Sequence, residues 1–165
     1  MRDKLDPTYN YAVQAIKQAI LNSQLRAARH VNEEQLALYF GIGKYISDNT
    51  RKNKWGTNAI ENISKQLSIE LPGLKGFSGT NLKLMRLFYE SWNSLFNSSA
   101  TADEMDENQN LVFLSDSLMM KNRPCADVEM SWSDFFALGF SLHTEILSKT
   151  ETLEERAFYI HQTAL

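Results

Sequence analysis

Residues 78–96 have the sequence SGTNLKLMRLFYESWNSLF, which is the most regular amphipathic pattern in the chain. Ser78 is a residue type that favours the N-cap of a helix. The apolar side chains that follow recur every three or four residues, as on one face of an α-helix, at Leu82, Met85, Phe88, Tyr89, Trp92, Leu95 and Phe96. Lys83 and Arg86 fall outside that face. The segment predicts a helix from Ser78 to about Phe96 that buries its apolar side.

A second helix is predicted directly before this one, from about Asn58 to Leu71. Its apolar residues keep the helical period, and Pro72 and Gly73 then end it. Two helices joined by a short turn, with basic side chains on the second, are what a helix-turn-helix requires. An ordinary pair of antiparallel helices with a solvated face would show the same pattern.

Two more helices are predicted upstream, at Tyr9–Arg29 and Asn32–Thr50, with Asn32 as the N-cap of the second. Gly41 and Gly43 lie on the apolar stripe of that second helix. Each weakens a helix by roughly 1 kcal/mol relative to alanine. Close approach of another helix is the expected compensation.

Downstream, the pattern breaks at residues 97–110, which contain four acidic and no basic residues and suggest a flexible or disordered loop. Capping-box sequences then predict one helix from Ser131 through Phe140 and another over Arg156–Ala164. The predicted fold is mostly α, with a helix-turn-helix or winged-helix-like core. We expect a single helical domain over 1–165, in which a basic helical core (1–97) and an acidic, irregular insertion (98–130) precede C-terminal helices (131–165) that pack back on the core.

Composition supports a globular chain, because 43 % of its 165 residues are apolar and 22 % are charged. No apolar run is long enough for a membrane span, and the first residues lack the apolar core of a secretory signal. The one cysteine, Cys125, cannot form an internal disulfide. These features predict a cytoplasmic protein that makes no membrane contact.

Charge is divided unevenly along the chain. Residues 1–97 contain 13 basic and 8 acidic side chains, a net of +5, whereas residues 98–165 contain 4 and 12, a net of −8, which together give the overall −3. This asymmetry indicates that the first half faces a polyanion. Chance clustering of surface charge is the alternative.

Motifs for catalysis are missing from the sequence. It contains no phosphate-binding glycine loop, no metalloprotease helix and no serine-nucleophile elbow. His30, His143 and His161 have no partners at metal-ligand spacing, so we expect them to be surface or capping residues. The prediction is therefore no catalytic residue, no cofactor and no metal.

Nucleic-acid binding has candidate residues around the predicted turn. Small polar groups at a helix N-terminus can donate to phosphates, and nearby basic residues add charge. The candidates are Lys75, Ser78, Thr80, Asn81, Lys83 and Arg86, with Arg51, Lys52 and Lys54 as a secondary phosphate patch. Arg86 could equally pair with Glu90 four residues on. Phe77 and Trp55 are expected in the core rather than stacked on bases.

The order of several motifs resembles the N-terminal domain of the YhcG family of prokaryotic nucleases. The likeness covers about residues 25–97 and 131–164. Its motifs are LYFGIGKYI at 38–46, Trp55-Gly56, PGLKGFS at 72–78, Asn81-Leu82, Met85-Arg86, Phe88-Tyr89, SWS at 131–133 and ERAFYI at 155–160.

The resemblance implies a function, because family members join such a helical DNA-binding domain to a C-terminal PD-(D/E)XK nuclease domain. The chain ends at Leu165 without such a domain and has no Glu-x-Lys triplet, so the expectation is a DNA-targeting domain that is not an enzyme. Asp134 stands where the family tends to have histidine. The alternative is a protein-interaction or oligomerisation module that docks a nuclease partner or a second copy, with Phe135-Phe136 and Phe158-Tyr159 as its apolar surface.

Overall fold

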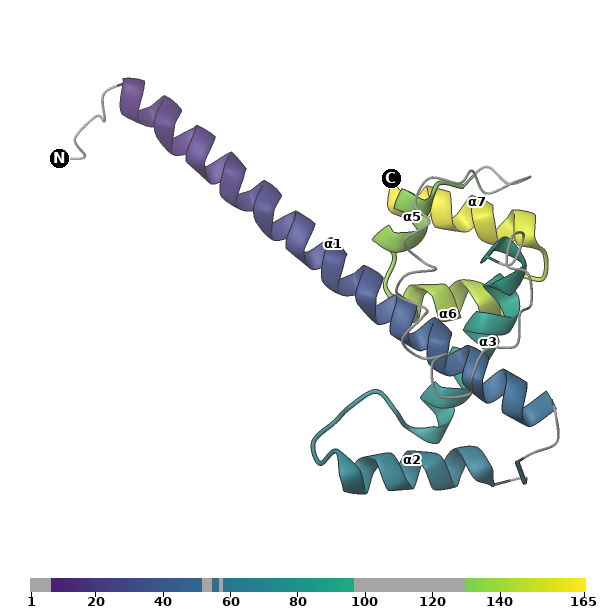
Figure 1. The fold of residues 1–165 in the computed structure, drawn as a ribbon. Helices are drawn as coiled ribbons and strands as arrows, with labels where there is room; N and C mark the ends of the chain where they lie inside the picture. Colours follow the sequence, from purple (N-terminus) through teal and green to yellow (C-terminus); the bar gives the residue numbers. More distant parts are fainter. Residues whose placement is uncertain (1–6, 52–54, 57, 97–129) are drawn as a thin grey trace.

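The computed structural model describes residues 7–51, 55–56, 58–96 and 130–165 (Figure 1). Within these ranges the chain forms only helices: α1 (Pro7–Arg51), α2 (Ala59–Glu70), α3 (Gly79–Phe96), α5 (Trp132–Ala137), α6 (Phe140–Lys149) and α7 (Leu153–Ala164). The prediction of a mostly α fold is confirmed. A winged helix would need a β-hairpin, and the described ranges contain no strand. The predicted insertion at 98–130 lies outside them except for Met130, which is buried.

A single helix, α1, occupies the region where two helices were predicted. The prediction of a break at Asn32 is wrong, because its side chain does not cap a helix. It donates instead to the carbonyl oxygens of Phe136 (2.8 Å) and Leu138 (2.9 Å), and so ties the middle of α1 to the end of α5. No glycine or proline interrupts the chain near this point, so the backbone stays helical through it.

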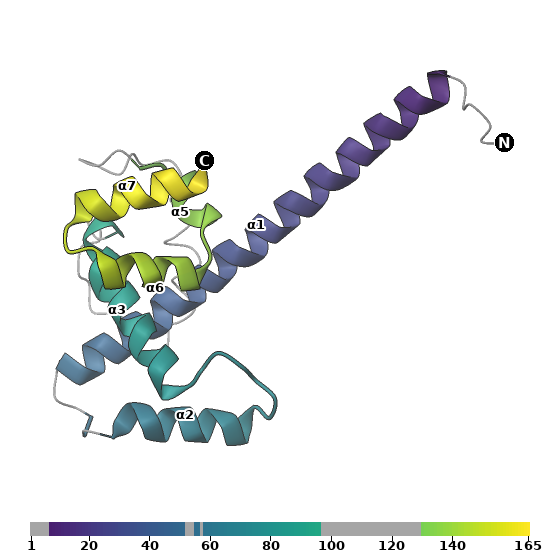
Figure 2. The same ribbon diagram turned by 180° about the vertical axis from the view of Figure 1, so that it is seen from behind.

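The second half of α1 crosses α3 at very short range, and this is the largest helix contact in the described structure (Figure 2). A Cβ placed on Gly43 would lie 2.1 Å from the Met85 carbonyl oxygen and 2.9 Å from Cβ of Tyr89. The expected compensation for Gly43 is thus confirmed. Because Gly43 has no side chain, the backbones of α1 and α3 can approach each other closely. Gly41, two residues earlier on α1, is also buried.

Two clusters of buried side chains make up the core. One joins α1, α2 and α3 through residues such as Ile46, Ile60 and Met85. The other joins α1 and α3 to the C-terminal helices, with Trp92 and Phe135 fully buried and their rings 5.3 Å apart in an edge-to-face arrangement. The α3 face predicted to be apolar supplies residues to both clusters, so α3 is the central helix of the fold.

The C-terminal region has three helices where two were predicted. Both capping boxes are confirmed: the hydroxyl of Ser131 accepts from the Asp134 N–H at 3.1 Å, and that of Thr152 accepts from the Glu155 N–H at 3.2 Å. The predicted helix through Phe140 is wrong. Extended backbone at Leu138 and Gly139 separates α5 from α6, and the cap at Thr152 starts α7 at Leu153.

His143 corrects the prediction that all three histidines are surface or capping residues. Its ring is fully buried against Phe88, Trp92 and Phe135, and Nε2 lies 2.9 Å from the Phe135 carbonyl oxygen. A carbonyl oxygen only accepts hydrogen bonds, so Nε2 of the neutral ring bears the proton and its N–H donates a hydrogen bond to the Phe135 carbonyl. Burial lowers the pKa of His143 to about 4, although the bond to the carbonyl acts in the opposite direction.

Candidate nucleic-acid interface

The turn between α2 and α3 is held in a defined shape by short polar contacts. Gly73 and Gly76 have φ values of 86° and 95°, which side-chain-bearing residues rarely adopt. The Ser64 hydroxyl donates to the Phe77 carbonyl at 2.9 Å and fastens the turn to α2. Phe77 also packs edge-on against Tyr39 of α1, with ring centroids 6.0 Å apart. The turn is therefore anchored on both neighbouring helices.

The first turn of α3 is capped as the sequence predicted. The Ser78 hydroxyl accepts from the Asn81 N–H at 3.2 Å, and the Asn81 side chain donates to the Gly76 carbonyl at 3.1 Å. Both candidate side chains thus have a structural task in shaping the turn. Ser78 and Thr80 are nevertheless exposed, so their polar groups face solvent at the positive end of the helix dipole.

Lys83 points to a carboxylate that no local sequence pattern indicates. Its Nζ lies 2.5 Å from Oε1 of Glu61 on α2. The hydrogen bond from Lys83 holds the pKa of Glu61 below its usual value. A Cβ on Gly79 would lie 3.4 Å from the same carboxylate oxygen, so Glu61 occupies the N-terminal end of α3, where a phosphate would bind.

Arg51 and Arg86 share a second carboxylate, that of Glu90. Oε1 of Glu90 lies 3.5 Å from a terminal nitrogen of Arg51 and 3.8 Å from Nε of Arg86, and it accepts a hydrogen bond from Ser47 at 2.8 Å. The alternative in which Arg86 pairs with Glu90 is therefore what the structure shows. This cluster lies at the end of α1, beside the middle of α3.

Lys75 differs from the other described basic candidates. It is exposed on the turn and has no carboxylate partner among the residues that the structure describes. With Ser78, Phe77 and residues of α2 it lines a shallow pocket of about 320 Å³. The structure brings Lys75, Ser78, Thr80 and Lys83 to the start of α3, and places Arg51 and Arg86 around Glu90. Lys52 and Lys54 lie outside the described residues.

The two aromatic residues near the turn belong to the core, as predicted. Trp55 is half-buried and packs edge-on against Tyr45, with centroids 5.7 Å apart. Phe77 is half-buried and packs against the cluster that joins α1, α2 and α3. Both rings therefore have a packing role in this part of the fold.

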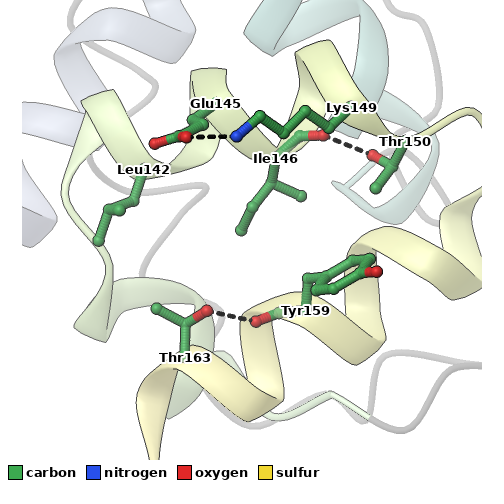
Figure 3. Close-up of a pocket in the computed structure, with 7 residues that line it drawn as sticks. All are labelled: Leu142, Glu145, Ile146, Lys149, Thr150, Tyr159 and Thr163. Atoms are coloured by element: carbon green, nitrogen blue, oxygen red, sulfur yellow. Dashed lines mark hydrogen bonds and ion pairs between the residues drawn. The ribbon is translucent and has the colours of Figure 1, made fainter.

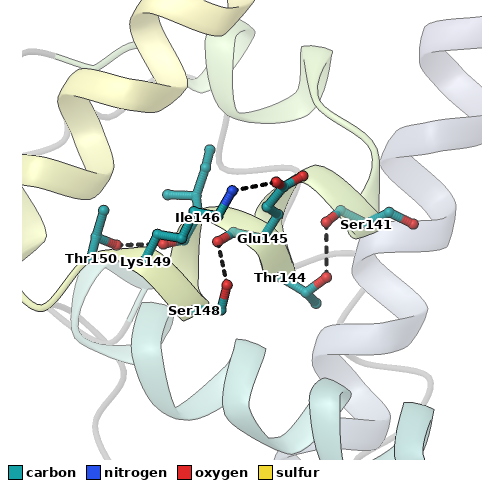
Figure 4. A network of polar contacts seen from close by, with 7 residues as sticks. All are labelled: Ser141, Thr144, Glu145, Ile146, Ser148, Lys149 and Thr150. Atoms are coloured by element: carbon teal, nitrogen blue, oxygen red, sulfur yellow. Dashed lines mark hydrogen bonds and ion pairs between the residues drawn. The ribbon is translucent and has the colours of Figure 1, made fainter.

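A second hollow lies between α6 and α7 (Figure 3). It has a volume of about 350 Å³ and is lined by Leu142, Glu145, Ile146, Lys149, Thr150, Tyr159 and Thr163. The polar groups of α6 bond within the helix itself: Lys149 to Glu145 at 2.6 Å, Thr150 to the Ile146 carbonyl and Ser148 to the Glu145 carbonyl (Figure 4). Glu145, Lys149 and Thr150 of the lining thus already have partners within their own helix or at its end.

Asp134 has a contact beyond the helix cap. His161 of α7 places Nδ1 2.9 Å from Oδ2 of Asp134, which links α7 to the start of α5. Partial burial acts to raise the pKa of Asp134, but hydrogen bonds from His161 and Ser131 outweigh it and lower the pKa. The residue that departs from the family pattern therefore joins two helices here.

Metal-binding and membrane-spanning features are missing from the described residues. No group of three or more His, Cys, Asp or Glu side chains there could hold a metal ion. None of the described helices is both long and apolar enough to cross a membrane.

Comparison with known families is decisive for identity. The DUF1016 N-terminal domain matches residues 15–165, which is nearly the whole chain. The chain belongs to this family. The DUF1016 N-terminal domain is the N-terminal domain of YhcG-like nucleases, so the resemblance seen in the sequence is confirmed and the chain is a nuclease-associated domain. No curated protein and no solved structure shows a significant match to the chain.

Proposed function

We propose that this DUF1016 N-terminal domain binds DNA through α2, the turn and the start of α3, and thereby directs a nuclease to its substrate in the cytoplasm. The supporting observation is that Ser78 and Thr80 at the start of α3 and Lys75 on the turn are exposed, and that Lys75 has no carboxylate partner among the described residues. In residues 44–90, which contain these elements, basic side chains outnumber acidic ones by eight to four. Such an excess attracts a phosphate backbone. Cleavage is left to the family's nuclease domain.

The nine proposed contacts fall into groups with different tasks. Lys75 and Lys83 meet phosphates beside the start of α3, where the exposed hydroxyls of Ser78 and Thr80 add donors. Asn81 holds the turn through its bond to Gly76. A second group of residues would contact another phosphate: Arg51, Lys52, Lys54 and Arg86.

Glu61 and Glu90 limit this binding, because Glu61 already pairs with Lys83, and Glu90 already pairs with Arg51 and Arg86. A phosphate that meets these basic groups must replace a carboxylate. We therefore expect weak binding in which Glu61 acts as a competitor for the site at the start of α3.

Fluorescence anisotropy of labelled duplex DNA at several salt concentrations tests the proposal. Lys75→Ala combined with Lys83→Ala is expected to weaken binding and to reduce the slope of log K against log salt by about 2, roughly one for each lost phosphate contact. Glu61→Gln is expected to tighten binding, since it releases Lys83 from its ion pair. Lys149→Ala on α6 removes the same charge away from the turn and should leave the slope unchanged.

Two results would contradict DNA binding at this surface. One is the absence of binding at low salt by both the natural chain and Glu61→Gln. The other is a salt slope that falls as much in Lys149→Ala as in the α2–α3 variants, which would mean that only net charge matters.

A second candidate function is docking of a protein partner, such as a nuclease domain, on the α6–α7 face. Phe158 and Tyr159 are 58 % and 50 % exposed there, and Leu142 is 43 % exposed. Phe135 and Phe136, which were also predicted to lie on such a surface, are buried core residues instead. Apolar docking would persist at high salt, whereas phosphate binding would not.

A further inference from the structure

The first half of α1 extends away from the other helices (Figures 1 and 2). All fifteen residues from 17 to 31 are exposed, including Ile20 (52 %), Leu21 (48 %) and Val31 (70 %). Most of the stability of a protein helix comes from packing its apolar face rather than from intrinsic propensity. This part of α1 has an apolar face that no described residue covers.

Seven exposed residues lie in one line along α1, at steps of three and four. They are Lys17, Ile20, Gln24, Ala27, Val31, Glu34 and Leu38, and we refer to them as the α1 row. Alternating steps of three and four place residues on the seam of a coiled coil. At 100° per residue, the core residues Leu36, Phe40 and Gly43 lie about 140–200° around the helix from Leu38. The α1 row therefore faces away from the body of the domain and is open to a partner.

The charges on this helix favour one kind of partner. Arg26 and Arg29 lie on the side opposite the α1 row, so they do not oppose close approach of another helix. The two charged residues of the row are Lys17, which is basic, and Glu34, which is acidic. A parallel copy would place Lys17 against Lys17 and Glu34 against Glu34. An antiparallel copy would place each lysine against a glutamate.

We propose that two copies of this chain associate through the α1 row as an antiparallel helix pair. With the twofold axis between Leu25 and Arg26, Lys17 faces Glu34 of the second copy, Ile20 faces Val31 and Gln24 faces Ala27. Each apolar layer recurs twice because the interface is isologous. The overlap between Lys17 and Glu34 is about 26 Å long at 1.5 Å per residue.

The sizes of the side chains beside the row also fit such an interface. Leu21 flanks the row and would contact Ala28 of the second copy, so a large side chain meets a small one. The overlap thus buries three large apolar side chains from each copy together with the neighbouring alanines and one ion pair at each end. The proposal does not depend on DNA binding, because the α2–turn–α3 unit lies at the far end of α1.

Sedimentation equilibrium of the 165-residue chain without DNA tests the association. We expect a concentration-dependent mass that approaches twice the 18.9 kDa of one chain. Ile20→Glu is expected to raise the dimer dissociation constant by at least about tenfold, because it places a charge in the seam. Asn22→Glu is the matched control on the opposite side of the same turn and should leave the constant nearly unchanged. Near-ultraviolet circular dichroism from the buried Trp92 would show that both variants keep the folded body.

Charge exchange tests the orientation. Lys17→Glu alone should weaken the dimer, and Lys17→Glu together with Glu34→Lys should restore it, since each lysine again faces a glutamate. In a Cys125→Ser background, chains with Lys17→Cys should form a disulfide with chains that contain Glu34→Cys, and not with each other.

Three results would overturn the proposal. A monomer at every concentration would refute the association. A dimer that Ile20→Glu does not weaken would place the interface elsewhere. Disulfides between two Lys17→Cys chains would show a parallel pair. None of these results bears on DNA binding by α2 and α3, so the two proposals can fail separately.

Discussion

Gly43→Ala is expected to lower the free energy of unfolding by about 3 kcal/mol, the upper part of the usual range for overpacking a core. The added methyl would lie 2.1 Å from the Met85 carbonyl oxygen, and backbone cannot rotate away as a side chain could. To relieve the clash, α1 and α3 must separate where the described structure has its largest helix contact. Separation would also loosen Tyr89, whose Cβ lies 2.9 Å from the added atom.

Urea denaturation followed by circular dichroism measures this effect. The matched control is Gly56→Ala, where nothing lies within 4 Å of the added Cβ, and its effect should stay below about 1 kcal/mol. Equal effects from the two substitutions would mean that the close approach of α1 and α3 is not what makes Gly43 necessary.

Local sequence signals were sufficient to predict α2, α3, the start of α5 and the capping box of α7. In each case the information lies within one helix: the apolar period of α3, the proline and glycine after α2, and the reciprocal bonds of Ser131 with Asp134 and Thr152 with Glu155. Local agreement between cap, period and stop signal explains why these predictions hold.

Contacts between distant segments account for the predictions that failed. Asn32 has the residue type of an N-cap, yet its partners are carbonyls 104 and 106 residues away in sequence. The Leu138 carbonyl that Asn32 binds also lies at the division between α5 and α6. The residue type of Asn32 alone does not distinguish the two roles.

The same limit applies to the candidate interface. Pairing of Arg86 with Glu90 was foreseeable, because the two residues are four apart on one helix. Pairing of Lys83 with Glu61 was not, because it joins two helices across 22 residues. A position for Glu61 at the start of α3 follows only once the packing of α2 on α3 is known.

The buried histidine gives the domain an expected pH dependence in a range where most carboxylates do not titrate. His143 has a pKa of about 4 in the folded chain and an ordinary value of 6.5 when unfolded. Between these values the unfolded chain binds a proton that the folded chain does not, so stability rises with pH. The contribution is fully present above pH 6.5 and is lost as the pH falls. It amounts to about 2 kcal/mol between pH 7 and pH 5, and about 3 kcal/mol by pH 4.

The carboxylates act at lower pH. Hydrogen bonds and ion pairs lower the pKa values of Glu61, Asp134, Glu145 and Glu155, so their stabilisation is present above their unfolded values and is lost below them. Unfolded carboxyl groups titrate near pH 4. The interval from pH 5 to pH 7 therefore lies above the range in which these carboxylates titrate.

Urea denaturation of His143→Gln at several pH values measures this effect. Glutamine can still donate a hydrogen bond to the Phe135 carbonyl but does not titrate, so the loss of stability between pH 7 and pH 5 should shrink by about 2 kcal/mol. His30→Gln, on the exposed part of α1, is the matched control and should keep the natural slope. If His143→Gln retained the full pH dependence, the proton uptake would belong to another group, and the neutral, buried state of His143 would have no influence on folding near neutral pH.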